Sequence, residues 1–264
     1  MKISEVLLNA KKNGKKLFIP YIVAGDPNIT VTGDFLVALE KAGAAIIELG
    51  VPFSDPVADG PTIQRASERA LSKNTTLLEI LDLVRHLRKS KSLTVPVVLF
   101  SYFNPIFKMG LEEFTAKAEK SGISGVLTVD LPPEEAEEYV ASLSAHNIET
   151  IFLASPTTSE SRLKLVDKNS SGFVYYVSRL GVTGAKKDIS DTLSQEIANL
   201  KKFVKKPIAI GFGISTPAQA KTVSQYADAV VVGSALVDLI EKNPDPEKAI
   251  VAISTFTKEI VAVL

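Results

Sequence analysis

The sequence contains no cysteine and only two histidines among its 264 residues. The lack of cysteine excludes disulfides, thiolate metal ligands and a cysteine nucleophile. The two histidines, His86 and His146, are too few for a multi-histidine metal centre, and both lie in patterns typical of exposed helix residues. We therefore expect no metal site in this chain.

An excess of charge and long apolar runs are also missing. Thirty Lys and Arg residues balance thirty Asp and Glu residues, so no global field favours nucleic acid or an acidic membrane. No apolar run approaches the roughly 20 residues of a membrane-spanning helix. Residues 1–16 contain no apolar core long enough for a signal peptide. These patterns predict a soluble, cytoplasmic protein.

The sequence does contain a regular alternation of short apolar segments and amphipathic helical segments. Alternation of this kind predicts a parallel sheet with right-handed crossovers. Eight such units in 264 residues predict one (β/α)₈ TIM barrel over residues 1–264 rather than an open sheet. We expect extra helices before strand 1, after strand 2 and after strand 8. The predicted strands are 17–23, 45–49, 96–101, 125–129, 150–153, 173–177, 207–211 and 229–232.

Residues 46–66, IIELGVPFSDPVADGPTIQRA, join the end of a strand to a loop that carries carboxylates. The apolar run ends in Glu48, and Asp59 lies in the Gly- and Pro-rich loop that follows. Because active sites of barrel folds lie at the carboxyl ends of the strands, the two acids can converge on one pocket and suit general acid–base chemistry. Alternatively, Glu48 pairs with a neighbouring cation and Asp59 caps the next helix. The spacing alone does not decide between them.

Three glycine-rich segments follow the last three predicted strands: RLGVTG at 179–184, GFGIS at 211–215 and VVGSAL at 231–236. Glycine lets backbone N–H groups approach an anion closely, and Ser234 opens a short helix whose N-terminus attracts anions. A tight turn would explain one such loop. Three at one rim favour a phosphate site, which recurs at this place in the fold.

Two further absences narrow the chemistry. No predicted strand contains lysine, so the nucleophile of a Schiff-base aldolase is missing from its usual place, and no GxGxxG follows the first strand. What remains is metal-free acid–base chemistry on a phosphorylated small molecule in an apolar pocket. The walls of this pocket are predicted to be Tyr21, Phe100, Tyr102, Leu127, Val129, Leu153 and Phe212. Ordinary filling of the barrel interior would explain some of these apolar residues as well.

Seven segments, in order and over nearly the whole chain, resemble the motifs of the tryptophan synthase alpha chain family. They are FIPYIVAGDP, ELGVPFSDPVADGPTIQ, VLFSYFNPIFKMG, VDLPPEEA, YYVSRLGVTGAK, PIAIGFGIS and ADAVVVGSAL. The second segment is highly specific. Tyr21 and Phe100 stand where the family often has Phe and Leu.

The resemblance implies a retro-aldol cleavage of indole-3-glycerol phosphate to indole and glyceraldehyde 3-phosphate. By the family's pattern Glu48 handles the proton transfers, Asp59 accepts a hydrogen bond from the indole N–H, and Tyr175 lies near the same site. The resemblance places the indole among Tyr21, Phe100, Leu127, Val129 and Leu153. It places the substrate's phosphate end at Gly184, Phe212, Gly213, Gly233 and Ser234.

The resemblance also implies a loop that closes over the substrate, with Arg179 and Thr183 in it and Thr183 contacting Asp59. It further implies a beta-chain partner in an alpha2-beta2 heterotetramer, which uses pyridoxal phosphate and receives the indole through a tunnel; this chain itself is expected to need no cofactor. The expected partner contacts are Asp55, Pro56, Asn104, Pro105, Asp130 and Pro132.

Two alternatives remain open at this point. One is a standalone indole-3-glycerol-phosphate lyase that releases free indole without a beta chain. The other is a non-catalytic phosphosugar-binding subunit that only activates its partner, and the presence of both Glu48 and Asp59 argues against it.

Overall fold

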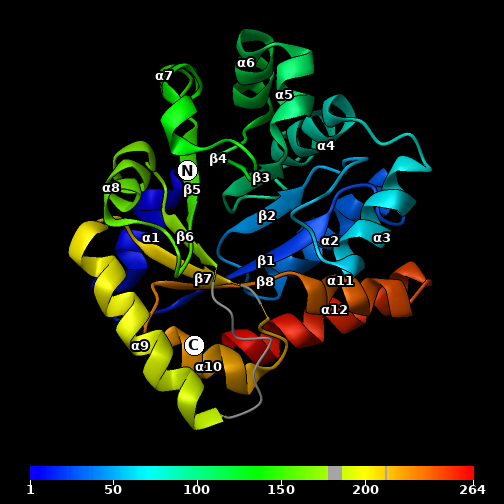
Figure 1. The fold of residues 1–264 in the computed structure, drawn as a ribbon. Helices are drawn as coiled ribbons and strands as arrows, with labels where there is room; N and C mark the ends of the chain where they lie inside the picture. Colours follow the sequence, from blue (N-terminus) through cyan, green and yellow to red (C-terminus); the bar gives the residue numbers. More distant parts are fainter. Residues whose placement is uncertain (178–185, 212) are drawn as a thin grey trace.

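Eight parallel strands close into a barrel in the order in which they occur along the chain. The structure is a computed structural model that describes residues 1–177, 186–211 and 213–264, without the side chains of 186–191. Figure 1 shows the strands at the centre and the helices around them. The barrel predicted from the sequence is confirmed. Its strands are β1 Leu17–Val23, β2 Ile47–Gly50, β3 Val97–Ser101, β4 Gly125–Thr128, β5 Glu149–Ala154, β6 Val174–Val177, β7 Ile208–Gly211 and β8 Ala229–Val232.

Both faces of the strands are apolar because the barrel has a filled interior and an outer cover of helices. In β1, Phe18 and Ile22 belong to the large cluster that the helices cover, whereas Ile19 belongs to the interior cluster. The interior cluster also contains Val98 of β3, together with Ile46 and Phe173, which directly precede β2 and β6. Alternate residues of a strand point to opposite faces, so Tyr21 and Glu48 point to the inside of the barrel.

The outer ring agrees with the predicted helices and adds one. Helix α5 follows β3 directly and contains Asn104 and Pro105, two of the expected partner contacts, for which no helix was predicted. Proline is tolerated in the first turn of a helix, since that turn needs no partner for its N–H groups. The helical elements are α1 Ile3–Lys12, α2 Ile29–Lys41, α3 Pro61–Leu71, α4 Leu77–Lys89, α5 Phe103–Met109, α6 Leu111–Ser121, η1 Pro133–Glu135, α7 Glu137–Ala145, α8 Glu160–Asn169, α9 Lys186–Phe203, α10 Pro217–Ser224, α11 Ser234–Lys242 and α12 Pro246–Val261.

The first helix closes the amino-terminal end of the barrel. Ile3 and Leu7 of α1 are buried in the interior cluster. The buried carboxylate of Glu149, at the start of β5, accepts hydrogen bonds from the backbone N–H groups of Ile3 at 2.5 Å and Ser4 at 3.2 Å. An acid at a helix N-terminus satisfies amides that have no partner within the helix. The opposite end of the barrel, at the carboxyl ends of the strands, holds the loops.

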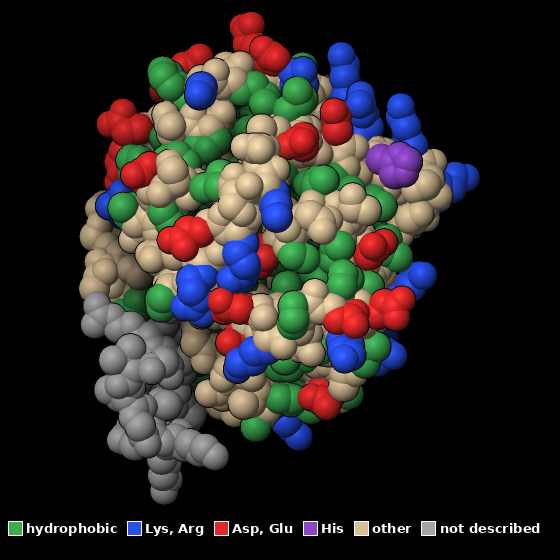
Figure 2. Space-filling view, turned by 90° about the vertical axis from the view of Figure 1, so that its right-hand side faces the viewer, with side chains coloured by type: hydrophobic (Ala, Val, Ile, Leu, Met, Phe, Trp, Pro, Cys, Tyr) green, Lys and Arg blue, Asp and Glu red, His purple; other side chains and the backbone are tan. Residues whose placement is uncertain are grey.

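The surface carries mixed charges. On the side of the molecule that faces right in Figure 1, acidic, basic and apolar side chains alternate without a large field of one sign (Figure 2). Among the helices of the described residues, none has the length and apolar character to cross a membrane.

Candidate active site

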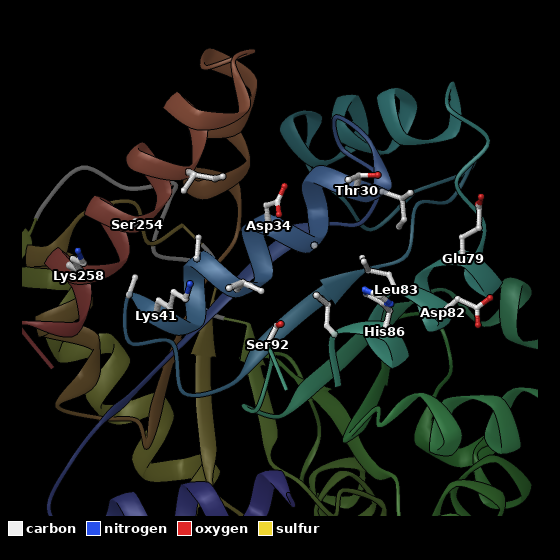
Figure 3. Close-up of a pocket in the computed structure, with 17 residues that line it drawn as sticks. Thr30, Asp34, Lys41, Glu79, Asp82, Leu83, His86, Ser92, Ser254 and Lys258 are labelled. Carbon is white, nitrogen blue, oxygen red and sulfur yellow. The ribbon is translucent and has the colours of Figure 1, made fainter. Parts of the chain in front are cut away.

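Two sizeable cavities formed by described residues lie in very different places. One, of about 910 Å³, is a groove between the outer helices α2, α4 and α12. Figure 3 shows that its walls carry acidic residues such as Asp34 and Asp82 and basic residues such as Lys41 and Lys258. His86 lies in this groove on the exposed side of α4. No strand residue lines this groove, whereas barrel folds build their active sites at the carboxyl ends of the strands.

The second cavity, of about 570 Å³, opens at the carboxyl ends of the strands. It contains both acids singled out from the sequence, Glu48 and Asp59, together with Gly213, Gly233 and Ser234 from the predicted phosphate loops. We take this cavity as the candidate active site. Its lining is Tyr21, Glu48, Ala58, Asp59, Gly60, Ile63, Phe100, Tyr175, Val177, Gly213, Ile214, Ser215, Val231, Gly233, Ser234 and Ala235.

Glu48 is a buried carboxyl group without a polar partner. Its side chain projects from β2 into the barrel with 1% of its surface exposed, and neither carboxyl oxygen has a hydrogen-bond partner among the described residues. Burial raises the pKa of Glu48 from 4.5 to about 8. The alternative in which Glu48 pairs with a neighbouring cation is therefore wrong for the described part of the chain. At neutral pH this carboxyl group is largely protonated and can act as an acid.

Asp59 has a different environment, although it lines the same cavity. The hydroxyl of Tyr102 donates a hydrogen bond to Oδ2 of Asp59 at 3.1 Å and accepts one from the backbone N–H of Ala58 at 2.9 Å. Burial raises the pKa of Asp59, and the hydrogen bond from Tyr102 partly opposes that shift. Helix α3 begins after Gly60, which is its N-cap, so the alternative in which Asp59 caps this helix is also wrong.

Two tyrosines complete the polar side of the cavity, and each lies against a glycine on the next strand. A Cβ at Gly50 would lie 2.3 Å from the Tyr21 hydroxyl, and a Cβ at Gly211 would lie 2.1 Å from the Tyr175 hydroxyl. Only glycine leaves room for such contacts. Burial raises the pKa of both tyrosines well above 10, so both hydroxyls are protonated at neutral pH.

Two glycine-rich loops also line the cavity. Gly213 has a φ of 76°, in the left-handed region that favours glycine. Gly233 is the N-cap of α11, and Ser234 is the first residue of that helix. The first N–H groups of a helix have no partner within it and bind anions. Two of the three glycine-rich loops thus meet at the mouth of the cavity that contains the acids.

Several other residues were predicted for the site. Phe100 lines the cavity, but Leu127, Val129 and Leu153 pack in the interior cluster with Tyr175 and are absent from the lining. The predicted residues Arg179, Thr183, Gly184 and Phe212 lie outside the described residues.

The residues predicted to meet a partner lie after β2, β3 and β4, at the same end of the barrel as the cavity. Asp55, Asn104 and Asp130 are exposed, and Pro56, Pro105 and Pro132 are half-buried. Oδ1 of Asp130 accepts a hydrogen bond from the backbone N–H of Phe103 at 2.7 Å, which joins the ends of β3 and β4.

Comparisons with known proteins agree with this geometry. The family model of the tryptophan synthase alpha chain matches residues 7–263. The chain belongs to the tryptophan synthase alpha chain family. The tryptophan synthase alpha chain of Geotalea uraniireducens is 48% identical over 241 residues, which cover 91% of this chain and 90% of the relative. That of Polynucleobacter asymbioticus is 47% identical over 259 residues, or 98% and 97% of the two chains.

Solved structures of tryptophan synthase alpha chains have the same fold. The alpha subunit of Legionella pneumophila is similar with a TM-score of 0.92 and 37% identity, covering 100% of this chain and 98% of that one. A tryptophan synthase structure from Mycobacterium tuberculosis has a TM-score of 0.87 and 31% identity, covering 99% and 97%. The likeness extends over the whole barrel and its surrounding helices.

Sequence reasoning missed one functional contact in this alpha chain. It treats Tyr102 only as an apolar wall, whereas the hydroxyl of Tyr102 holds Asp59 and the preceding amide. The ring of Tyr102 also stacks on Phe53, with centroids 4.9 Å apart and planes at 28°. Its place directly after a predicted strand was the signal that could have identified it. Ile214 and Ser215 line the cavity as members of the predicted GFGIS segment, and Ile63 of α3 lines it without having been predicted.

Proposed function

We propose that Glu48 and Asp59 carry out the carbon–carbon lyase reaction of this family, the retro-aldol cleavage of indole-3-glycerol phosphate to indole and glyceraldehyde 3-phosphate. The observation that carries the proposal is the pair of acids in one cavity. One is a buried carboxyl group that has no hydrogen-bond partner among the described residues, and the other is held by a tyrosine. Environments that separate the pKa values of two carboxyl groups are typical of acid–base sites.

Protonated Glu48 supplies the proton for the first step. The proton passes to indole C3, and the ring becomes a cation with much of its positive charge at the N–H group. Asp59 accepts the hydrogen bond of that N–H group, and its negative charge stabilises the cation. The raised pKa of Glu48, about 8, favours this order because the acid form is present at neutral pH.

The second step returns the proton. Glu48, now a carboxylate, takes the proton from the hydroxyl on the carbon attached to the indole. The carbon–carbon bond breaks, its electron pair returns to the ring, and the carbon becomes an aldehyde. Indole leaves neutral, and Glu48 is protonated again for the next cycle. No other group is needed to balance protons or electrons.

The glycine-rich mouth of the cavity supports binding of the phosphate end. Gly213, Gly233 and Ser234 in the first turn of α11 line the same cavity as the acids. Tyr175 fills the space beside Gly211 and narrows the cavity next to Glu48. We propose that the loop with Arg179 and Thr183 closes over the bound substrate, as the family resemblance implies.

The variant Glu48→Gln tests the assignment. It keeps the size of the side chain but cannot donate and recover a proton, so turnover should fall at least ~10²-fold, the usual scale for general acid–base catalysis. Asp59→Asn should also lower turnover severely, because the charge that stabilises the indole cation is lost. Circular dichroism should show the fold of both variants unchanged. Near-normal turnover of folded Glu48→Gln would reject this role.

We further propose that the chain works in the cytoplasm with a beta chain in an alpha2-beta2 heterotetramer, in which pyridoxal phosphate belongs to the beta chain. The exposed residues at the cavity end, including Val57 at 87% and Phe107 at 70% exposure, support a contact there. An assay of indole release with and without a beta chain tests this. A rate that the beta chain leaves unchanged, with no complex by sedimentation, would favour a standalone lyase.

A further inference from the structure

The hydroxyl of Tyr21 is a polar group in the cavity to which the steps above give no role. Tyr21 is 8% exposed and lines the cavity together with Glu48 and Asp59. Among the hydrogen bonds between described residues, none uses this hydroxyl. Burial, and then the negative charges of Asp59 and Glu48, raise the pKa of Tyr21, so the hydroxyl remains a donor. The hydroxyl therefore faces the cavity with its donor and acceptor free for a bound ligand.

Gly50 defines where this hydroxyl lies relative to Glu48. Glu48 and Gly50 are two residues apart on β2, so they share the inner face, roughly 6.6 Å apart along the strand. Gly50 is nearer the carboxyl end, which is the mouth of the cavity. Since a Cβ on Gly50 would lie 2.3 Å from the Tyr21 hydroxyl, that hydroxyl occupies the space next to Glu48 on the mouth side.

Gly233 defines the other end of the Tyr21 side chain. A Cβ on Gly233 would lie 3.2 Å from Cδ1 of Tyr21 and 3.4 Å from its Cβ. The base of the ring therefore packs on the N-cap of α11, and the hydroxyl end reaches β2. A substrate that places its phosphate at α11 and its reacting carbon at Glu48 has to cross the edge of this ring.

We propose that the Tyr21 hydroxyl hydrogen-bonds the hydroxyl on the middle carbon of the substrate's three-carbon chain. This inference rests on the proposed function. The first carbon carries the hydroxyl that Glu48 deprotonates, and the third carries the phosphate. The middle carbon lies between them, as the Tyr21 hydroxyl lies between Glu48 and the mouth. Tyr21 is thus a specificity-determining residue, which selects chains that carry this second hydroxyl.

A comparison of two substrates in two proteins tests the proposal. One substrate is indole-3-glycerol phosphate, and the other is the same molecule without the middle hydroxyl. Both can be cleaved, because the retro-aldol step uses only the hydroxyl on the first carbon. Tyr21→Phe should lower kcat/KM about tenfold for the first substrate, the scale for a lost hydrogen bond to a neutral group. For the second substrate the change should be less than twofold.

Equal losses with both substrates, or no loss with either, would overturn the proposal. Tyr139→Phe is the matched control, since it removes a buried tyrosine hydroxyl that bonds Thr128 at 2.8 Å outside the cavity. Its ratio of kcat/KM between the two substrates should equal that of the parent. If the parent protein cleaves neither substrate, the proposed function itself fails, a result distinct from equal losses in an active enzyme.

Discussion

Tyr102 holds Asp59 across 43 residues of sequence, by a hydrogen bond of 3.1 Å from its hydroxyl to Oδ2. The same hydroxyl accepts the N–H of Ala58, so one side chain at the end of β3 restrains the loop after β2 at two neighbouring residues. The contact stabilises the ionised form of Asp59 against burial. It therefore links the shape of the loop to the charge that the reaction needs.

Tyr102→Phe should move the acid limb of the activity profile to higher pH. Without the hydrogen bond, the pKa of Asp59 rises further, so a larger part of the enzyme has a neutral Asp59 at mildly acidic pH. We expect kcat/KM at pH 6 to fall roughly tenfold, as for a lost hydrogen bond to a charged group. The pH dependence of kcat/KM measures this. In an Asp59→Asn background the second substitution should cause no such shift, and a shift there would contradict the role of Tyr102.

Glu48→Gln should make the protein more stable than its parent at alkaline pH. The folded-state pKa of Glu48 is about 8, above the ordinary 4.5, so the parent loses stability as the pH rises from about 4.5 to about 8. A full shift of this size corresponds to a few kcal/mol, and glutamine does not ionise. Urea unfolding at pH 5, 7 and 9 measures the difference.

The exposed Glu259→Gln is the control for this experiment, because this residue lies on the outer helix α12. Its free energy of unfolding should follow the parent at every pH. If Glu48→Gln also parallels the parent from pH 5 to pH 9, Glu48 is not buried with a raised pKa.

Gly233→Val should weaken binding of the phosphorylated substrate much more than binding of free indole. The added Cβ approaches Cδ1 of Tyr21 at 3.2 Å, and its methyl groups fill space at the N-terminus of α11. We expect KM for indole-3-glycerol phosphate to rise at least ~10-fold, because the N–H groups that attract the anion become inaccessible. Titration with indole alone should give a dissociation constant within about threefold of the parent. Equal losses for both ligands would remove the phosphate site from this loop.

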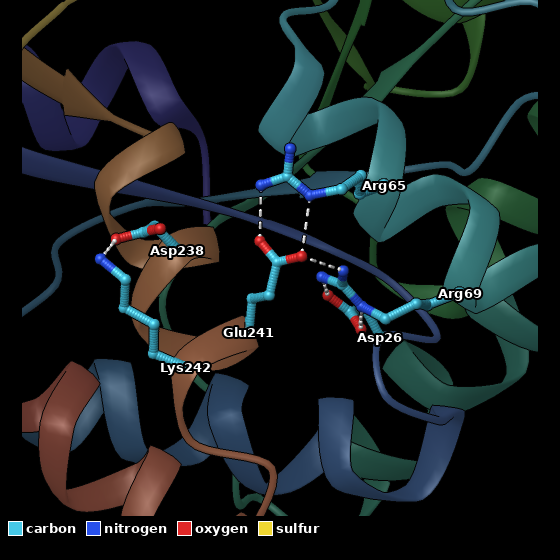
Figure 4. A network of polar contacts seen from close by, with 6 residues as sticks. All are labelled: Asp26, Arg65, Arg69, Asp238, Glu241 and Lys242. Carbon is cyan, nitrogen blue, oxygen red and sulfur yellow. Dashed lines mark hydrogen bonds and ion pairs between the residues drawn. The ribbon is translucent and has the colours of Figure 1, made fainter.

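Arg69→Met should destabilise the fold through Asp26. Arg69 bonds both carboxylate oxygens of Asp26 at 2.8 Å and also contacts Glu241, which Arg65 bonds as well (Figure 4). The side chain of Asp26 is only 3% exposed, so it would lose its charge partner in a buried place. We expect about 2 kcal/mol of lost unfolding free energy, less than for a fully buried pair because Arg69 is one-third exposed.

Arg85→Met provides the comparison for this cluster. Arg85 pairs with Asp82 one turn away on the same helix, and both side chains are about half exposed. Such a pair contributes at most about 0.5 kcal/mol. Denaturant unfolding of both variants at neutral pH measures the two effects. Equal losses would show that the Arg69 contacts act as ordinary surface pairs.

The predicted strands agree with the observed ones to within two residues, since periodicity and apolar runs are local properties. Helix α5 was not predicted because Asn104 and Pro105 are typical of a turn. Proline is equally compatible with the first turn of a helix, which is where Pro105 lies. Leu127 and Leu153 were expected in the pocket because they lie near the carboxyl ends of predicted strands. They pack in the interior cluster that also contains the cavity residues Tyr175 and Phe100, so their contact with an indole stays a prediction.

The sequence by itself determined the barrel and the meeting of Glu48 with the glycine-rich loops. Eight alternating units allow few topologies, and parallel strands bring all their carboxyl ends to one rim. Only the tertiary structure decided that Glu48 is buried with no hydrogen-bond partner in the described part of the chain, that Tyr102 holds Asp59, and that Tyr21 lies against Gly50. Desolvation and close contacts depend on the atoms of several strands at once. The burial of Glu48 and the contacts of Asp59 and Tyr21 therefore follow from how the strands pack against one another, and not from any single stretch of the chain.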